Sequence, residues 1–315
     1  MNEPVITADA VSVVHKARSG GLFRRDRVHA LTDATVAVRR GEVLGVVGES
    51  GCGKSTLARV LVGLQEPTSG TVAFHGTGPR GASVGMVFQD ASTALNPRLP
   101  VHRILRDPLD VHRRGNDASR RARVAELLDL VGLPGHVSDA LPAQLSGGQR
   151  QRVAIARALA LGPDVIVADE PTSALDVSVR AQILNLLVDL RERLGLGMAF
   201  ISHDIQTVRH LADRIIVMYL GRIVEEGPAG EIAAAPRHPY TRALFSATPS
   251  LLDDTEPIIL TGPVPSATHP PSGCPFRTRC WKATSDCATS YPAGTGDDAH
   301  RWHCIHPETP ARSHP

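Results

Sequence analysis

The stretch that decides the fold of this 315-residue chain is Gly48-Glu49-Ser50-Gly51-Cys52-Gly53-Lys54-Ser55. It follows the apolar run 43–47 and precedes a run of good helix formers. A strand, a loop of the pattern G-x-x-x-x-G-K-S and a helix together form a phosphate-binding loop. Glycines are needed there because the backbone must curl until its N–H groups point at phosphate oxygens. We therefore expect Lys54 to reach the terminal phosphates of a nucleotide and Ser55 to offer its hydroxyl to magnesium.

The structural alternative for this loop is a glycine-rich turn that only connects a strand to a helix. At average residue usage the pattern arises by chance about once in a hundred chains of this length, which favours nucleotide binding. The positive N-terminal end of the following helix adds to the attraction for phosphate. The residues expected around the nucleotide are Gly48, Ser50, Gly51, Cys52, Gly53, Lys54, Ser55 and Thr56. We interpret Cys52 as a small residue that contributes through its backbone.

A second apolar run, 165–168, ends in the two carboxylates Asp169 and Glu170. An acid at the carboxyl end of a buried strand lies beside the ligand crevice of an open sheet. Successive strand side chains point to opposite faces, so the two acids have different roles. We assign Asp169 to the magnesium shell and Glu170 to the water that attacks the γ-phosphate. The alternative is an acid pair that caps the next helix.

Short β-branched runs alternate with longer helical patterns before residue 228, which predicts an α/β fold with a mostly parallel sheet. The expected strands are 43–47, 83–88, 165–168, 197–201 and 214–218. The expected helices are 54–63, 119–131, 148–161, 177–194 and 205–211. Fourteen of the 24 prolines and four of the five cysteines lie at or after Pro228. We therefore expect a nucleotide-binding domain over 1–235 and an irregular C-terminal extension over 236–315.

The composition excludes several classes of protein. The 34 basic and 32 acidic side chains are too balanced for a nucleic-acid partner held by bulk charge. No stretch approaches the roughly 18 consecutive apolar residues of a membrane helix. The N-terminus has neither a basic cluster nor a following apolar core, so we expect no secretory signal and a cytosolic protein.

Leu145-Ser146-Gly147-Gly148-Gln149, at the start of a predicted helix, matches the signature sequence of ABC-type ATPases. Chance supplies this pentapeptide in only a few of about ten thousand such chains. The chain resembles that family over roughly 5–250, which implies a P-loop ABC-type fold with a RecA-like core and a helical subdomain at about 90–160. The resemblance also implies that Ser146, Gly147, Gly148 and Gln149 contact the ATP held by a partner subunit. The active form is then a head-to-tail dimer with two composite sites.

The resemblance assigns roles to further residues. Gln89 looks like the family's glutamine that touches magnesium and the attacking water, and His203 looks like the histidine that contacts the γ-phosphate. Ser173-Ala174-Leu175-Asp176 looks like the loop that crosses the dimer interface. The family stacks adenine on an aromatic residue near the N-terminus, and here His15 stands in the corresponding stretch. The identity of the stacking residue stays open.

Three segments, 89–98, 238–244 and 273–280, are similar to peptide and nickel importer ATPases. The chain thus resembles the ATP-binding subunits of oligopeptide and dipeptide importers. This implies an ATPase that drives peptide uptake, with a second ATP-binding subunit, two membrane permease subunits and, indirectly, an external substrate-binding protein as partners. It also implies a peripheral position on the cytoplasmic face of the membrane. A soluble ABC ATPase, a metal- or redox-responsive regulator and an exporter remain as alternatives.

The cysteine quartet of the extension has five, six and sixteen residues between neighbours, which is no common zinc or ferredoxin spacing. Disulfides are disfavoured in a reducing cytosol, which leaves metal ligation or simple burial. Some members of the importer subgroup carry an iron–sulfur cluster on a comparable quartet. The resemblance therefore implies a 4Fe–4S cluster held by Cys274, Cys280, Cys287 and Cys304. Zinc is the alternative, with His300, His303 or His306 as replacement ligands.

Overall fold

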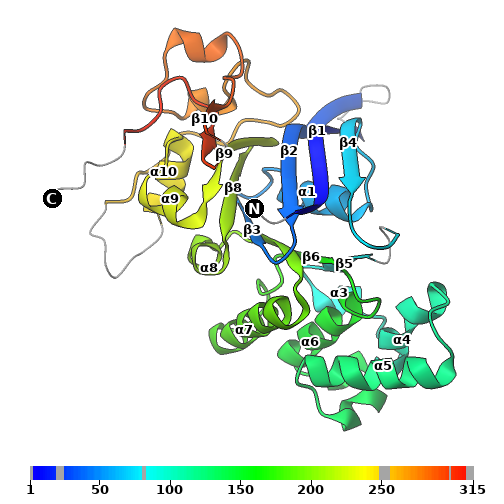
Figure 1. Cartoon of the computed structure of the whole chain (residues 1–315). Helices are drawn as coiled ribbons and strands as arrows, with labels where there is room; N and C mark the ends of the chain where they lie inside the picture. The colour runs from blue at the N-terminus through cyan, green and yellow to red at the C-terminus, as the bar shows by residue number, and fades with distance from the viewer. Residues whose placement is uncertain (1–2, 19–24, 80–82, 248–255, 298, 310–315) are drawn as a thin grey trace. The chain divides into compact units, whose positions relative to one another are not determined.

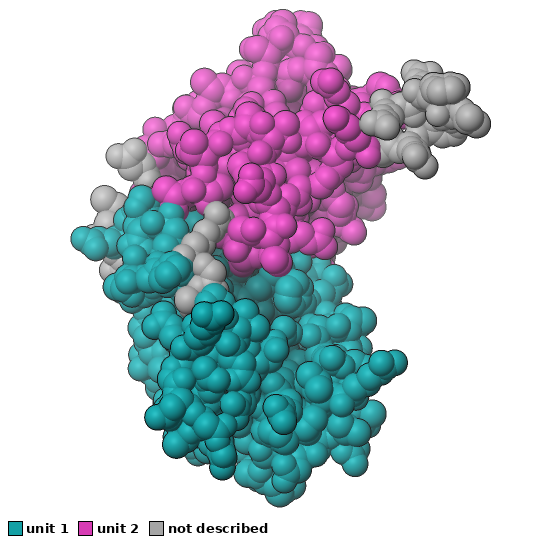
Figure 2. All heavy atoms as spheres, turned by 90° about the vertical axis from the view of Figure 1, so that its right-hand side faces the viewer, with its two compact units in different colours: residues 1–6, 38–42, 74–201 teal, residues 7–37, 43–73, 202–315 magenta. Residues whose placement is uncertain are grey.

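The computed structural model describes residues 3–18, 25–79, 83–247, 256–297 and 299–309. The chain forms two compact units, which Figure 2 shows in different colours. Unit 1 contains residues 1–6, 38–42 and 74–201, and unit 2 contains residues 7–37, 43–73 and 202–315. Both units are therefore assembled from segments that are separated in the sequence.

The strands at the centre of unit 2 are β3 (Val43–Val47), β8 (Arg214–Tyr219), β9 (Arg222–Pro228), β11 (Arg301–Trp302) and β10 (Thr295–Gly296). β3 and β8 are parallel, and β9, β11 and β10 follow as successive antiparallel neighbours (Figure 1). Every residue of β3 and β8 is buried. Their near-continuous apolar sequences are those of strands covered on both faces.

Unit 2 also holds most of a three-stranded sheet and several helices. The sheet, of order β2-β1-β4, contains β1 (Pro4–Arg18), β2 (Arg25–Arg39) and β4 (Ser69–Phe74). The helices are α1 (Lys54–Val62), α8 (Ile205–Leu211), α9 (Ala229–Ala234) and α10 (Pro239–Ser246). Two short 3-10 helices, Pro275–Thr278 and Ser285–Ala288, lie in the C-terminal segment.

Unit 1 is built on three parallel strands, β5 (Val84–Val87), β6 (Val165–Asp169) and β7 (Gly197–Ile201). β6 is the middle strand, and all residues of β6 and β7 are buried. The α-helices of the unit are α3 (Ala91–Ala94), α4 (Val101–Val111), α5 (Asp117–Leu130), α6 (Gly147–Ala158) and α7 (Val177–Leu194). Two 3-10 helices, Gly135–Asp139 and Pro142–Gln144, connect α5 to α6.

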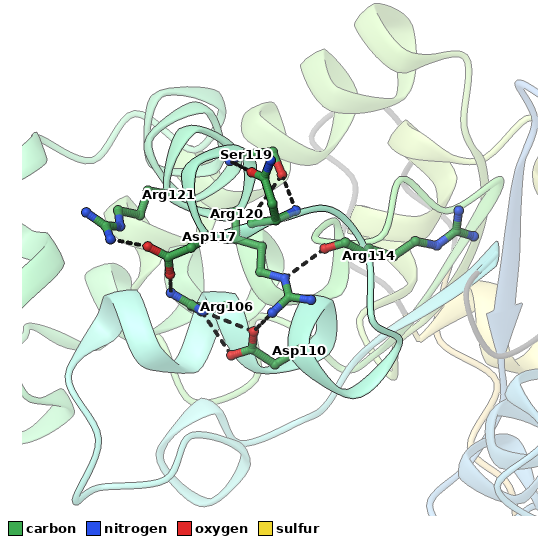
Figure 3. A network of polar contacts seen from close by, with 8 residues as sticks. Arg106, Asp110, Arg114, Asp117, Ser119, Arg120 and Arg121 are labelled. Carbon is green, nitrogen blue, oxygen red and sulfur yellow. Dashed lines mark hydrogen bonds and ion pairs between the residues drawn. The ribbon is translucent and has the colours of Figure 1, made fainter.

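An arginine–aspartate network joins α4 to α5 (Figure 3). Arg106 on α4 donates to both carboxylate oxygens of Asp110, at 3.1 and 3.0 Å, and to Asp117 at 2.5 Å. Arg120 on α5 donates to Asp110, and Arg121 donates to Asp117. The hydrogen bonds from Arg106 and Arg121 lower the pKa of Asp117, so this carboxylate stays charged. The network fixes the two helices against each other at an exposed end of unit 1.

The parallel strands and the helices predicted from the sequence are confirmed with small shifts. Strands 43–47 and 197–201 and helices 177–194 and 205–211 have the predicted bounds. Helix α6 ends at Ala158 instead of residue 161, because the N–H groups of Ala160 and Gly162 donate to carbonyls three residues back and so form turns. The sequence reasoning missed the strands β1, β2, β4, β9, β10 and β11 and the helices α3, α4, α9 and α10. β1 and β2 mix charged with apolar residues, so that they lack the apolar run of a strand buried on both faces.

Gly85 lies where β5 crosses closest to α6. A Cβ atom at this position would stand 2.5 Å from the carbonyl oxygen of Ala158, and helix backbone cannot move away cheaply. We predict that Gly85→Ala lowers the free energy of unfolding by about 1–3 kcal/mol, as overpacking does elsewhere. Urea unfolding of the full chain measures the change.

The matched control is Gly135→Ala. A Cβ atom at Gly135 would meet nothing within 4 Å, and the backbone there needs no positive φ. This variant is expected to stay within about 0.5 kcal/mol of the parent. Equal unfolding midpoints for the Gly85 and Gly135 variants would show that β5 and α6 can separate without cost.

Candidate functional site

The predicted phosphate loop lies in unit 2, between β3 and α1. Gly48, Gly51 and Gly53 have φ angles of 153°, 78° and 108°, a region that residues with a side chain rarely adopt. A Cβ atom on Gly48 would stand 2.2 Å from the carbonyl of Met218, and one on Gly53 would stand 2.4 Å from the carbonyl of Ala30. Gly53 is also the N-cap of α1 and offers no side chain to its first N–H groups. The helix start is therefore free for an anion.

Lys54 folds back over this loop. Its side chain is buried, and Nζ donates to the carbonyl oxygens of Gly48 at 2.7 Å and Glu49 at 3.0 Å. The lysine is thus held next to the open start of α1, with Ser55 and Thr56 following in the first turn. Burial raises the pKa of the Cys52 thiol, which keeps this neighbour of Lys54 neutral. Lys54 therefore places a positive charge at a site suited to phosphate.

Glu49, the second residue of the loop, has two partners that the sequence reasoning missed. Its carboxylate accepts hydrogen bonds from Arg279, and its N–H donates to the hydroxyl of Tyr240. Burial raises the pKa of Tyr240 above its usual range, so this hydroxyl stays protonated. Arg279 and Tyr240 are 230 and 191 residues away in the chain, and no sequence signal connects them to the loop.

Gln89 and Glu170 are brought together in unit 1. The side-chain amide of Gln89 donates to a carboxylate oxygen of Glu170 at 3.2 Å. Glu170 follows the end of β6 with a φ angle of 48°, and its N–H donates to the carbonyl of Ile201 at 2.9 Å. A non-glycine residue at positive φ is strained, and such strain clusters at functional sites. Asp169, the last residue of β6, is buried, so the two acids lie in different surroundings.

The alternative reading of this acid pair, as the cap of the next helix, is wrong. The N-cap of α7 is Asp176, whose carboxylate accepts from the N–H of Val179 at 2.9 Å. This hydrogen bond lowers the pKa of Asp176. Asp169 and Glu170 are thereby left for another task. Ser173, in the same connecting segment, donates to the Glu170 carbonyl at 3.1 Å.

The signature residues start helix α6 in unit 1. Ser146 is the N-cap and accepts from the N–H of Gln149 at 3.2 Å, while Gln149 accepts from the N–H of Ser146 at 3.0 Å. This capping box satisfies both groups within the chain. A Cβ atom on Gly148 would stand 2.7 Å from Val179, whereas Gly147 has room. Ser146 is exposed, so the start of α6 presents a serine and two glycines to the surface.

His203 and His15 both lie in unit 2. His203 is exposed in the short segment before α8, where Asp204 caps the helix by accepting from the N–H of Thr207 at 3.3 Å. His15 is exposed on β1, and its Nε2 lies 3.3 Å from Nε2 of Gln65. Neither histidine belongs to the unit that contains Gln89, Asp169, Glu170 and the signature residues. Their assigned roles stay predictions.

The four cysteines of the C-terminal segment line one small pocket in unit 2, together with His238, Lys282 and His306. Burial raises the pKa values of Cys274 and Cys280, and that of Cys304 to about 11, which favours the neutral form of these three thiols. Nε2 of the buried His238 has no hydrogen-bond partner among the residues that the structure describes, and burial lowers the pKa of this histidine to about 3. Soft thiolate donors suit iron–sulfur clusters and zinc. Over the described residues, however, no group of three or more His, Cys, Asp or Glu is arranged to hold a metal ion.

Two of the three histidines considered as zinc ligands have other partners. Nε2 of His300 lies 2.8 Å from the carboxylate of the buried Glu225, and Nδ1 of His303 lies 3.0 Å from the carbonyl of Pro292. Neither lines the cysteine pocket, whereas His306 does. The prediction failed for His300 and His303 because spacing along an irregular segment does not determine which way a side chain points.

Comparisons with known proteins identify relatives of this chain. A family model described as "ABC transporter" matches residues 31–173, and one described as "Oligopeptide/dipeptide transporter, C-terminal region" matches residues 224–287. The chain is 46% identical over 303 residues to the dipeptide transport ATP-binding protein DppF of Haemophilus influenzae, covering 92% of this chain and 93% of that protein. It is 45% identical over 319 residues to the di/tripeptide transport ATP-binding protein DppF of Pseudomonas aeruginosa, covering 97% and 98%.

A solved structure is also similar to this chain in its three-dimensional fold. An ATP-binding cassette determined as a dimer in a post-hydrolysis state, bound to ADP and Pi, matches with a TM-score of 0.62 and 32% sequence identity. The match covers 71% of this chain and 98% of that one. Among the helices of the described segments, none has the length and apolar character needed to cross a membrane.

Proposed function

This chain belongs to the ABC transporter ATP-binding proteins of the dipeptide and oligopeptide type, and we propose that it hydrolyses ATP to drive peptide uptake through separate membrane subunits. The observation that carries the proposal is the hydrogen bond between Gln89 and Glu170 at the end of a buried strand, in a chain that also has an open phosphate loop. The chain matches these transport proteins over nearly their whole length, which favours this function over that of a soluble ATPase unconnected to transport.

The phosphate loop binds the nucleotide. Backbone N–H groups around Gly51 and Gly53 and the start of α1 face the phosphates, while Lys54 exchanges its two carbonyl partners for phosphate oxygens. Ser55, Gln89 and Asp169 would hold magnesium, which neutralises charge on the phosphates when bound. His15 is the residue proposed to meet adenine, through an imidazole ring that offers a smaller surface than the ring of Tyr or Trp.

Hydrolysis depends on a positioned water. The Glu170 carboxylate, held by the Gln89 amide, accepts a proton from that water as it attacks the γ-phosphate. His203 contacts the γ-phosphate, and the positive charge of Lys54 stabilises the charge that develops on its oxygens. Catalysis of phosphoryl transfer depends mainly on positioning and charge, so small movements of these groups control whether ATP is hydrolysed.

A second ATP-binding subunit completes the site. The exposed start of α6, with Ser146, Gly147 and Gly148 in front of it, is suited to contact the nucleotide of a neighbouring subunit. In the assembly that we propose, two permease subunits bind the ATPase pair at the cytoplasmic face of the membrane. An external binding protein delivers the peptide to the permeases. ATP binding closes the pair, and hydrolysis reopens it.

The C-terminal extension, proposed to begin at about residue 236, carries the cysteine pocket. The four thiols and the unpartnered His238 nitrogen give it a soft donor set, and we propose a 4Fe–4S cluster there, with zinc as the alternative. Such a group would connect segments that have little secondary structure of their own, and metal binding adds directly to folding stability. Its proposed role is structural.

Glu170→Gln tests the general base. The substitution keeps the shape of the side chain and its contact with Gln89 but removes the proton acceptor. We predict a loss of about 100-fold or more in ATP turnover with ATP binding retained. Phosphate release and equilibrium binding of ATP measure the two effects. Glu192→Gln changes an exposed carboxylate on α7 that pairs with the neighbouring Arg191, and it serves as control. Turnover within twofold of the parent would show that another group activates the water.

Lys54→Ala tests the phosphate loop. The substitution removes the charge that the loop holds next to the start of α1, so that ATP binding itself should weaken by about tenfold or more. Titration with a fluorescent ATP analogue measures this. Arg59→Ala removes an exposed cation from the same helix and should leave the affinity unchanged. An unaltered affinity in the Lys54 variant contradicts the assignment of this loop.

Metal analysis tests the cysteine pocket. Protein purified without oxygen is expected to contain about four iron and four sulfide per chain and to lose them in Cys280→Ser. Cys52→Ser, outside the pocket, should retain them. Elemental analysis, acid-labile sulfide and visible absorbance give the result. Stoichiometric zinc without iron removes the cluster in favour of the alternative, and absence of both metals contradicts any metal at this pocket.

A further inference from the structure

A bidentate ion pair joins the phosphate loop to the C-terminal segment. Arg279 donates from Nη1 to Oε2 of Glu49 at 2.7 Å and from Nη2 to Oε1 at 3.1 Å. The side chain of Arg279 is only 7% exposed and that of Glu49 is 26% exposed. A bidentate pair of charged groups is among the strongest and most directional hydrogen-bonding arrangements in proteins. It therefore restricts where Glu49 can lie.

The backbone of the same loop residue is held from a second direction. The N–H of Glu49 donates to the hydroxyl of Tyr240 on α10 at 2.9 Å. The Glu49 carbonyl accepts from Lys54 Nζ at 3.0 Å and from the N–H of Cys52 at 3.2 Å. The side chain, the N–H and the carbonyl of Glu49 thus all take part in hydrogen bonds. Because its N–H is committed to Tyr240, Glu49 supports the loop instead of donating to phosphate.

Both outside partners are themselves fixed by a buried aromatic cluster, which consists of Tyr219, Tyr240 and Phe276. The ring of Tyr240 lies 4.7 Å from that of Tyr219 and 5.3 Å from that of Phe276 between centroids. Arg279 lies over the Tyr219 ring at 6.0 Å and donates to its hydroxyl at 3.4 Å. Aromatic contacts of this kind lock side-chain orientation. The cluster therefore makes a rigid base from which Arg279 and Tyr240 reach the loop.

We propose that Arg279 and Tyr240 are positioning residues that hold the phosphate loop in its nucleotide-binding shape through Glu49, so that the C-terminal segment sets the affinity for ATP. This inference rests on the function proposed above, in which the loop binds ATP. The glycines of the loop can adopt many backbone conformations, and only one of them presents the N–H groups to phosphate. If the loop is competent for only a fraction of the time, the apparent dissociation constant rises in inverse proportion to that fraction. The clamp on Glu49 keeps that fraction high.

Loss of such a clamp affects the KM for ATP and kcat differently. Bound phosphates can order the loop themselves, so loss of the clamp raises the KM for ATP but leaves kcat at saturating ATP nearly unchanged. A contact that only anchored the C-terminal segment would change thermal stability without this separation. The two interpretations therefore differ in what happens to binding.

The experiment uses the full chain with changes on both sides of the contact. Arg279→Ala and Glu49→Gln are each expected to raise the dissociation constant for ATP about tenfold, and the double variant no further, because both remove one interaction. Arg279→Lys keeps the charge but not the bidentate geometry and should restore only part of the affinity. Tyr240→Phe, which removes only the hydroxyl acceptor, should raise the constant about threefold.

Arg277→Ala is the matched control. Arg277 lies in the adjacent 3-10 helix and donates to the carbonyl and hydroxyl of Ser272. Its loss should leave ATP binding unchanged. Thermal melts of every variant identify any that fail to fold, and if Arg279→Ala is one of them, Glu49→Gln and Tyr240→Phe test the clamp from the loop and from α10.

Results that overturn the clamp can be distinguished from results that overturn the proposed function. Folded Arg279, Glu49 and Tyr240 variants that bind ATP as tightly as the parent overturn the clamp and leave the ATPase function standing. Effects of Arg279→Ala and Glu49→Gln that add together also overturn it, since two independent sites are then involved. A parent chain that binds no ATP, or binds it equally well after Lys54→Ala, instead overturns the function on which the clamp rests.

Discussion

A backbone that offers its N–H groups to an anion must be kept in place by the structure around it. Here that constraint falls on the loop of residues 48–53, where three glycines have positive φ angles and added side chains would collide with the carbonyls of Met218 and Ala30. The loop follows β3, which is buried along its whole length and paired in parallel with β8. Burial of these strands fixes where the loop begins, and its glycines adopt their positive φ angles without strain.

Helices α6 and α7 of unit 1 are capped by residues at their own starts. Ser146 and Gln149 satisfy each other at the start of α6, and Asp176 satisfies the start of α7. Asp169 and Glu170 therefore have no duty as caps, and the amide of Gln89 can hold Glu170. In unit 2, by contrast, the N-cap residue Gly53 provides no side-chain cap for α1.

The sequence predicted the parts of this architecture that depend on local patterns. The phosphate loop, the acid pair and the signature residues each stand at the end of a predicted strand or the start of a predicted helix, and the structure has those elements within a few residues. It could not predict the pair of Arg279 with Glu49, because such contacts depend on how distant segments fold back on the loop. For the same reason it misplaced His300, which turns toward the buried Glu225. β1 and β2 escaped notice because their mixed composition lacks the apolar runs that mark the central strands.

The folded-back position of Lys54 has a consequence for the cycle of an ATPase. A buried ammonium group without oxygen partners would be severely destabilised, yet here two carbonyls of its own loop act as an internal substitute for phosphate. Arrival of a nucleotide is then a ligand exchange at a cation that is already solvated by the protein. Departure of the product reverses the exchange and leaves no bare charge behind. Between turnovers the chain therefore stays folded around the buried side chain of Lys54.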